Sequence, residues 1–351
     1  MTEKEIFGWI EGIQHPGRED KTLAELEIVR EVVVDGSSVT VTLAFPRKPD
    51  PLKNYLVGAV KAAIYREAPE GTSVEVKTVV SAPAPQKKAP ELGLDQVANV
   101  GHIIGIASGK GGVGKSTVAV NLAVALARQG FRVGLADADV YGPSVPLMTG
   151  TEGSVPEMVR EGEQDLMVPV EKFGVKWMSI GYFAKPDQAL IWRGPMACSA
   201  LKQMILQVKW GPLDFLLIDL PPGTGDIHIS LVNDIPMTGA VIVTTPQTVA
   251  LADVRKGIDL FQNPAVGRRI LGIVENMAWF TPEEHPEEKY YIFGRDGGAS
   301  MASEFDVPLL GSIPLVQSLR ESGDTGEPAA LGSRPDSLAF LSLASALTSA
   351  L

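Results

Sequence analysis

The residues with the clearest chemical potential form one glycine-rich segment, Gly109–Thr117 (GKGGVGKST). It matches the spacing G-x-x-x-x-G-K-[ST], and an apolar run, His102–Ser108, precedes it. Glycines have no Cβ, so backbone N–H groups can turn inward around phosphate oxygens, and the start of a helix adds partial positive charge. We therefore expect Lys115 to reach the β- and γ-phosphates of a nucleotide and the Ser116 hydroxyl to contact Mg²⁺.

The whole segment is predicted to surround the phosphates. Its members are Gly109, Lys110, Gly111, Gly112, Val113, Gly114, Lys115, Ser116 and Thr117. Lys110 is a second lysine beside this cradle, and we prefer a phosphate-facing role for it to simple solvation. The alternative interpretation is a glycine-rich turn that binds nothing. The apolar run before the segment and the helical pattern after it, Ser116–Gln129, disfavour that alternative.

Acidic residues follow two other apolar runs. Asp137 and Asp139 end the run in RVGLADADVYG, and Asp219 ends the run in LDFLLIDLPPGTGD. Ligands of open α/β sheets bind at the carboxyl ends of the strands. We expect Asp219 to hold Mg²⁺, Asp137 to support it through water, and Asp139 to orient the attacking water. The alternative for Asp137 and Asp139 is that they cap the following turn.

The segment after Asp219, Pro221–Gly225, has backbone N–H groups at its glycines. We expect it to sense the γ-phosphate, ordering with a triphosphate and relaxing with a diphosphate.

The elements that must position these residues alternate between short apolar runs and helical patterns. The runs are Ile103–Ala107, Val133–Ala136, Phe215–Ile218, Ala240–Val243 and Ile270–Val274. Helical periodicity lies between them, as in Ser116–Gln129 and Thr248–Phe261. This alternation predicts an α/β fold with a mostly parallel sheet and helices on both faces.

The first eighty residues have a different pattern, which predicts a small α+β domain. Two β-branched stretches, 27–34 and 38–45, flank the hairpin signal Asp35-Gly36. A helical pattern over 52–65 and a third strand over 74–79 follow. Residues 81–91 are rich in proline and read as a linker. The second domain is therefore expected over 92–351.

Composition excludes several classes of protein. The net charge of -11 over 351 residues argues against a general nucleic-acid binder. A spanning run of about eighteen apolar residues and a secretion signal are not found in the sequence, so we expect a cytoplasmic protein without a membrane anchor. The single cysteine, Cys198, fits a reducing compartment and excludes an internal disulfide. The apolar tail of the chain has one basic residue, Arg334, and is expected to pack rather than bind membranes.

The order and identity of the motifs resemble the Mrp/ApbC family of P-loop ATPases. The motifs are SGKGGVGKST, DADVYGPS, WRGPM, IDLPPGTGD, TTPQ, VENM and YIFG. The family belongs to the deviant-Walker group, which includes the Min and Par positioning proteins and nitrogenase iron protein. The resemblance covers about residues 92 to 320, and the first eighty residues resemble the small domain often placed ahead of this ATPase.

The resemblance implies a homodimer with ATP and Mg²⁺ near the subunit interface. It implies that Lys110 contacts phosphates across that interface, that Asp139 is required for hydrolysis, and that Asn276 recognises adenine. The role it implies is the binding of iron–sulfur clusters and their transfer to apoprotein clients, coupled to ATP turnover.

One departure from the family concerns the cluster ligands. Typical members carry a Cys-x-x-Cys pair between VENM and YIFG, whereas Ala278–Tyr290 (AWFTPEEHPEEKY) contains no cysteine. Iron–sulfur clusters favour thiolates, so the cluster ligands stay unassigned. We interpret the acids and His285 of this stretch as a solvated loop in preference to a hard-metal site, and Cys198 as a packing residue. A chaperone-like or positioning ATPase that acts on a protein client without a cluster stays open as the alternative function.

Overall fold

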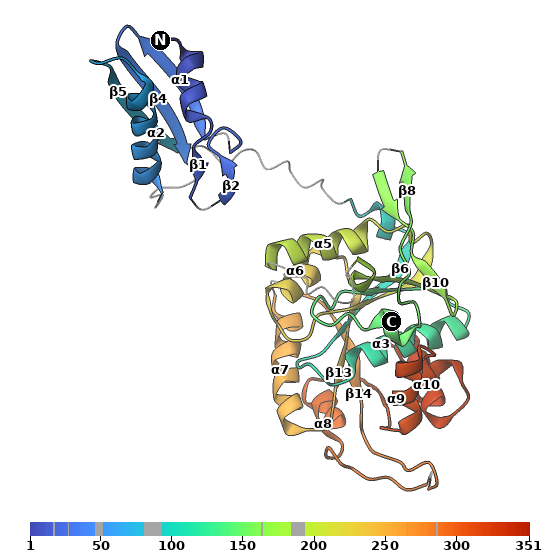
Figure 1. The fold of residues 1–351 in the computed structure, drawn as a ribbon. Coiled ribbons are helices and arrows are strands. Elements are labelled where there is room, and N and C mark those ends of the chain that lie inside the picture. The colour runs from blue at the N-terminus through green and yellow to red at the C-terminus, as the bar shows by residue number, and fades with distance from the viewer. Residues whose placement is uncertain are drawn as a thin grey trace. The chain divides into compact units, whose positions relative to one another are not determined.

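The computed structural model describes residues 1–16, 18–26, 28–45, 52–80, 93–162, 164–183, 194–264, 266–285 and 287–351. The chain divides into two compact units, Met1–Glu91 and Leu92–Leu351 (Figure 1). The expected linker, 81–91, and Trp192-Arg193 of the WRGPM motif lie outside the described residues.

The N-terminal unit packs two helices against a three-stranded sheet. Its elements are α1 (Glu3–Ile10), β1 (Gln14–His15), β2 (Arg18–Thr22), β3 (Val29–Asp35), β4 (Ser38–Phe45), α2 (Lys53–Glu67) and β5 (Ser73–Val80). The sheet order is β3-β4-β5, with β3 antiparallel and β5 parallel to β4. The predicted hairpin is present, because Gly36 adopts a φ of 60° and Asp35 pairs with Ser38. Apolar side chains of both helices and the sheet, such as Ile6, Leu43 and Ile64, close its core.

The second unit is built on an eight-stranded sheet among its described residues. Its strands in the order β10-β11-β7-β12-β6-β13-β14-β15 are Val170–Lys172, Val175–Ser179, Val133–Asp137, Leu213–Asp219, Val100–Ala107, Gly239–Thr244, Ile270–Glu275 and Leu309–Ser312. All neighbours are parallel except the edge pair β10 and β11. A separate antiparallel pair consists of β8 (Met158–Glu161) and β9 (Gln164–Met167).

Helices cover both faces of this sheet, as predicted (Figure 1). One face carries α5 (Gly194–Leu206), α6 (Asp226–Asp234), α7 (Thr248–Gln262) and α8 (Gly297–Glu304). The other carries α3 (Lys115–Arg128), α4 (Val145–Met148), α9 (Gln317–Thr325) and α10 (Pro335–Ser349). Short 3-10 helices span Asp95–Val97, Ile180–Phe183 and Ala329–Leu331. The mostly parallel α/β fold is therefore confirmed.

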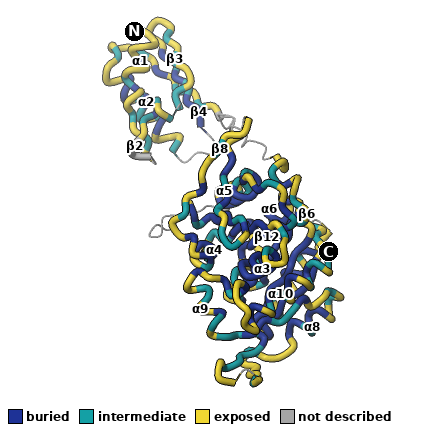
Figure 2. The backbone as a smooth tube through the Cα atoms, turned by 90° about the vertical axis from the view of Figure 1, so that its right-hand side faces the viewer, coloured by how far each residue is buried: buried dark blue, intermediate teal, exposed yellow. Residues whose placement is uncertain are grey.

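The sheet is the buried centre of the unit, and the tube through its strands is dark blue in Figure 2. Successive residues of a strand face opposite sides, so Ile103 joins the core under α5 and α7 while Ile104 joins the core under α3. Burial on both faces explains why these strands read as continuous apolar runs. The apolar tail packs as expected, because Phe340 and Leu343 of α10 are buried in the same core as α3.

Candidate nucleotide-binding site

The phosphate loop joins β6 to α3, and its backbone is shaped for close approach by a ligand. Gly112 and Gly114 both adopt a φ of 81°, a conformation that other residues rarely take. Space around Gly111 and Gly112 is open on the side where a Cβ would stand. Gly114 begins α3 without a side-chain cap, so the N–H donors of the first turn are left for an anion. These observations fit the phosphates of a nucleotide.

Gly109 is fixed for a different reason. A Cβ at this position would lie 2.4 Å from the carbonyl of Asp253 on α7, so a larger residue does not fit. The first residue of the loop therefore packs directly against the backbone of α7.

Lys115 and Ser116 both bond the carboxylate that ends β12. The Lys115 ammonium lies 2.6 Å from Asp219 Oδ1, and the Ser116 hydroxyl lies 2.5 Å from Asp219 Oδ2. Lys115 is buried, with 6% of its surface exposed, and Asp219 is fully buried. Burial raises the pKa of Asp219, and the contact with Lys115 opposes this effect. The structure thus brings together three of the predicted site residues.

Asp137 lies beside Asp219 because the two residues pair across the parallel strands β7 and β12. It accepts hydrogen bonds from the Ser179 hydroxyl at 2.8 Å and from the backbone N–H groups of Asp139 and Val145. Burial, followed by the charge of Asp219, raises the pKa of Asp137 to about 7. Together with the Ser116 hydroxyl, these carboxylates form a set of hard oxygen donors, which fits Mg²⁺.

Asp139 lies two residues beyond the end of β7, and its carboxylate is near the same lysine. Its Oδ2 is 3.8 Å from the Lys115 ammonium, and its Oδ1 accepts a hydrogen bond from the N–H of Tyr141. Its side chain is 14% exposed, unlike those of Asp137 and Asp219. A carboxylate in this position is accessible to water as well as to the phosphate side of the site.

Lys110 is exposed at the outer side of the loop, and its carbonyl accepts a hydrogen bond from the Ser108 hydroxyl. Thr117 lies in the first turn of α3, where its carbonyl accepts from the Asn121 amide.

Asn276 follows β14 at the same sheet edge and is 3% exposed. Its Nδ2 donates to the Val113 carbonyl at 2.9 Å, so the residue predicted to recognise adenine contacts the phosphate loop itself.

The segment Pro221–Gly225 is bonded to the base of the phosphate loop. The Gly223 N–H donates to the Ser108 carbonyl at 3.0 Å. His228, in the first turn of α6, is 2% exposed, and its Nδ1 lies 3.1 Å from the Pro221 carbonyl. That carbonyl only accepts, so Nδ1 carries the proton, and Nε2 has no hydrogen-bond partner among the described residues. Burial lowers the pKa of His228.

Three further residues shape this edge and were not predicted from the sequence. Ser179 contacts Asp137, His228 contacts the Pro221–Gly225 segment, and the buried Glu275 contacts the first turn of α8. A polar residue at the carboxyl end of an apolar run was the available signal for Glu275, whereas Ser179 ends a short stretch that Lys176 interrupts. His228 has no such signal, because only the fold brings it back to Pro221.

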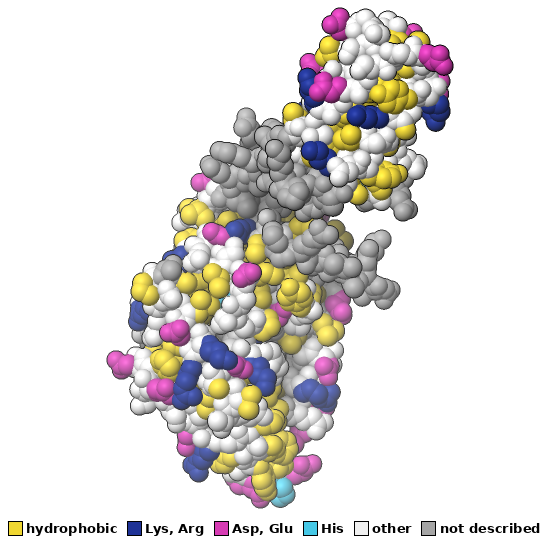
Figure 3. All heavy atoms as spheres, turned by 90° about the vertical axis from the view of Figure 1, so that its left-hand side faces the viewer, with side chains coloured by type: hydrophobic (Ala, Val, Ile, Leu, Met, Phe, Trp, Pro, Cys, Tyr) yellow, Lys and Arg dark blue, Asp and Glu magenta, His cyan; other side chains and the backbone are white. Residues whose placement is uncertain are grey.

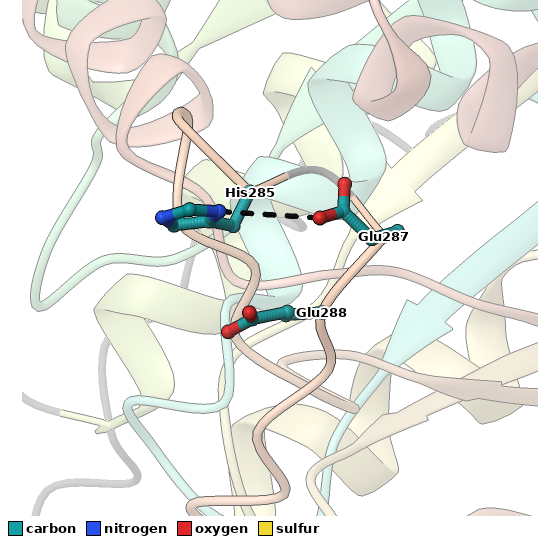
Figure 4. A group of neighbouring side chains, drawn as sticks. All are labelled: His285, Glu287 and Glu288. Carbon is teal, nitrogen blue, oxygen red and sulfur yellow. Dashed lines mark ion pairs between the residues drawn. The ribbon is translucent and has the colours of Figure 1, made fainter.

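The cysteine-free stretch after Asn276 is a loop with an exposed acidic tip. Glu283, Glu284 and His285 are exposed. Figure 4 shows His285 turned toward Glu287, with Nδ1 3.9 Å from its carboxylate, and Glu288 on the same turn. One donor atom from each of these three residues lies within 4.8 Å of the others, but the solvated-loop interpretation fits their exposure. Cys198 lies elsewhere, on α5, half-buried against the core.

A surface pocket of about 540 Å³ opens at the amino ends of β7, β11 and β12, away from the phosphate loop. Its cations are already engaged: Arg132 pairs with Asp214, while Lys172 and Lys176 donate to backbone carbonyls. On the face drawn in Figure 3, basic and acidic side chains of the described residues are interspersed, so no large patch of one charge is seen among them. We therefore place the candidate nucleotide site at the carboxyl edge of the sheet and not in this pocket.

Comparison with known proteins decides the family. A family model described as "ParA: NUBPL iron-transfer P-loop NTPase" matches residues 99–348. The chain belongs to this family. The result confirms the resemblance to Mrp/ApbC proteins and the assignment of the second unit as a P-loop NTPase.

Two curated relatives of this NUBPL-type NTPase are each called "Iron-sulfur cluster carrier protein". The one from Synechocystis is 44% identical over 337 residues, which cover 96% of this chain and 93% of the relative. The one from Aquifex aeolicus is 42% identical over 345 residues, covering 92% and 91%. The similarity to both relatives thus extends into the N-terminal unit.

Solved structures agree with the fold. A nucleotide-binding protein from Archaeoglobus fulgidus, in complex with ADP, is 36% identical, with a TM-score of 0.60, and covers 70% of this chain and 94% of its own. The cell division ATPase MinD of Pyrococcus furiosus is 25% identical, with a TM-score of 0.50, and covers 72% of this chain and 100% of its own.

None of the helices in the described part of this NTPase has the length and apolar content that spanning a membrane requires.

Proposed function

We propose that this chain is a Mg²⁺-dependent ATPase that carries iron–sulfur clusters to apoprotein clients. The observation that carries the proposal is the phosphate loop whose Lys115 and Ser116 both meet the buried Asp219, in a chain of the iron-transfer NTPase family. The cargo follows from the relatives, which are named iron–sulfur cluster carriers. We place this activity in the cytoplasm, the reducing compartment that fits a chain with one cysteine.

The residues around the phosphates have separate tasks. The backbone of Gly109–Thr117 cradles the phosphate oxygens, and Lys115 places its charge on the β- and γ-phosphates. Ser116 and Asp219, with Asp137 behind them, would hold Mg²⁺, which neutralises phosphate charge when bound. Asn276 recognises adenine at the end of β14.

Hydrolysis needs a residue that positions water, and Asp139 is partly exposed, whereas Asp137 and Asp219 are fully buried. It accepts a hydrogen bond from the water that attacks the γ-phosphorus, and the bond to the bridging oxygen of the β-phosphate breaks. Lys110 is exposed in the loop, which supports a role in stabilising charge in the pocket of a second copy. We therefore propose a homodimer as the active form.

The chain offers few thiolates to a cluster. Cys198 is its single cysteine, and it lies half-buried on α5. A cluster then needs ligands from the client or from a small thiol, so we expect the isolated protein to hold it weakly. The cysteine-free loop also favours a second candidate function, a chaperone-like ATPase that acts on a protein client without a cluster.

A transfer assay tests the proposal against this second candidate. The protein is mixed anaerobically with iron, sulfide and a small thiol, and an apo-ferredoxin serves as acceptor. We expect faster ferredoxin reconstitution with Mg-ATP than with no nucleotide, and loss of that acceleration in Lys115→Ala. ATP turnover without any acceleration of transfer would favour the chaperone-like function instead.

A further inference from the structure

The carboxylate of Glu275 is buried at the end of β14 and has no part in the roles described above. The residue is 4% exposed. Its Oε1 accepts the N–H of Gly298 at 2.9 Å, and its Oε2 accepts the Ser312 hydroxyl at 3.4 Å. Its carbonyl accepts the N–H of Ile313 at 2.8 Å. Glu275 thus fixes the first turn of α8 to the carboxyl edge of the sheet.

The next residue, Asn276, is fixed to the phosphate loop. Its side chain donates to the Val113 carbonyl, and its backbone N–H donates to the Thr244 carbonyl at 2.7 Å. The contact is tight, because a Cβ on Gly114 would lie 2.2 Å from Asn276 Nδ2. A displacement of the phosphate loop therefore acts directly on Asn276.

The loop between β14 and α8 leaves the sheet after Asn276 and returns at Gly298. It is pinned midway, where Phe280 pairs with Tyr290 and with Leu315. At its return the backbone is packed closely, since a Cβ on Gly298 would lie 2.7 Å from Glu275 Cβ. Two consecutive residues thus contact two different segments. Asn276 contacts the phosphate loop, and Glu275 contacts Gly298, just after the loop of residues 277–296.

We propose that Glu275 is a positioning residue that couples the nucleotide pocket to the 277–296 loop. The inference rests on the proposed nucleotide binding. A nucleotide that orders the phosphate loop and Asn276 also orders the peptide bond between Glu275 and Asn276. The buried hydrogen bond from the Gly298 N–H to the Glu275 carboxylate then extends this order to α8 and the loop. Coupling between two sites is reciprocal, so a client bound at the loop would in turn change nucleotide affinity.

Hydrogen–deuterium exchange of the full chain tests the coupling, with ADP or a non-hydrolysable ATP analogue and Mg²⁺. In the wild type we expect nucleotide to slow exchange of peptides within 277–300 about tenfold, a size typical of coupled sites. Glu275→Ala should bind a fluorescent nucleotide with similar affinity and lose this response. Glu275→Gln should keep it, because its amide oxygen still accepts the Gly298 N–H. Ser312→Ala is the matched control, which removes only the longer bond to the same carboxylate.

A purely structural role would give a different pattern. Exchange in Glu275→Ala would then be faster with and without nucleotide, and the ratio between the two conditions would stay at the wild-type value, which would overturn the coupling. Gly298→Ala disturbs the same contact from the helix side and should lose the response as Glu275→Ala does. A wild-type loop that does not respond although nucleotide binds would overturn the coupling alone. Failure of the wild type to bind nucleotide would overturn the proposed function as well.

Discussion

The phosphate-loop edge and the loop after Asn276 meet in space at Asn276 but are built in opposite ways. At the edge, Asp137 and Asp219 are fully buried, and each accepts several hydrogen bonds. In the loop, Glu283 and Glu284 are exposed at the tip of a turn. The edge works through backbone shape and buried charge, which tolerate little change. The side chains at the tip of the loop are in water, so we expect substitutions there to change its chemistry and leave the fold intact.

The largest effect that this comparison predicts is at Lys115. Lys115→Ala should lower ATP turnover by at least about 10²-fold and sharply weaken ATP binding, because the buried charge on the phosphates is lost. Phosphate release with Mg²⁺ and binding of a fluorescent nucleotide measure both effects. Lys256→Ala, an exposed lysine on α7, is the control and should behave as the wild type. Wild-type turnover in Lys115→Ala would refute the P-loop assignment of the site.

Asp139 should separate binding from hydrolysis. Asp139→Ala should bind ATP but hydrolyse it about 10²- to 10⁴-fold more slowly, since the water loses its positioning carboxylate. Steady-state kinetics should therefore show a loss in kcat with little change in KM. A variant that loses affinity and keeps kcat would instead assign Asp139 to substrate binding.

Lys110 should act in the pocket of the neighbouring chain. Lys110→Ala should keep nucleotide binding and lose turnover, and mixing it with Asp139→Ala should restore part of the activity. In a mixed dimer one pocket has an intact Asp139 and receives Lys110 from the other chain. Mixed dimers, purified with two different tags, that stay inactive would contradict a role across the interface.

A smaller effect depends on pH. Burial lowers the folded-state pKa of His228 below its ordinary value of 6.5, so below pH 6.5 the unfolded chain binds a proton at this residue that the folded chain does not. The contribution of His228 to stability is therefore complete above pH 6.5 and falls as the pH drops, by at most about 1.4 kcal/mol per pH unit. The raised pKa of Asp137, about 7, acts in the opposite direction, so the comparison with the wild type carries the test. In urea unfolding between pH 5.5 and 8, His228→Gln should gain stability relative to the wild type as the pH falls below 6.5, and a constant difference between the two proteins would contradict this prediction.

The smallest effect is expected at the acidic tip. Glu283→Gln combined with Glu284→Gln should leave ATP turnover unchanged and shift the free energy of unfolding by no more than about 0.5 kcal/mol, because both side chains are in water. Turnover and urea unfolding measure this. A large loss of turnover would show that the tip belongs to the nucleotide machinery.

The sequence predicts the parts of the fold that local patterns encode. The five apolar runs are strands of the sheet, and Ser116–Gln129 and Thr248–Phe261 match α3 and α7 within one residue at each end. Strands β10, β11 and β15 were not predicted. They span three to five residues, and Val175–Ser179 contains a lysine, so neither length nor apolar content marks them.

The site shows the same division. The phosphate loop is local in sequence, and so are the acids that end strands. The bond from Ser179 to Asp137 and the anchor from Glu275 to Gly298 join residues 42 and 23 positions apart, which only the sheet order and the return of the chain bring together. The place of Lys110 inside the phosphate loop already predicts a phosphate-facing role. Its proposed role across an interface and the proposed role of Asn276 came from the family resemblance.

Cluster content measured beside nucleotide content tests the central claim most directly. The wild type and Cys198→Ser are incubated anaerobically with iron, sulfide and Mg-ADP, passed over a gel-filtration column, and assayed for iron, sulfide, visible absorption and bound nucleotide. If the chain keeps the residues that bind nucleotide and lacks those that bind a cluster, both proteins should hold nucleotide near stoichiometry and little iron. A stoichiometric cluster that survives the column and persists in Cys198→Ser would contradict it, since the ligands would then lie in residues assigned here to solvent.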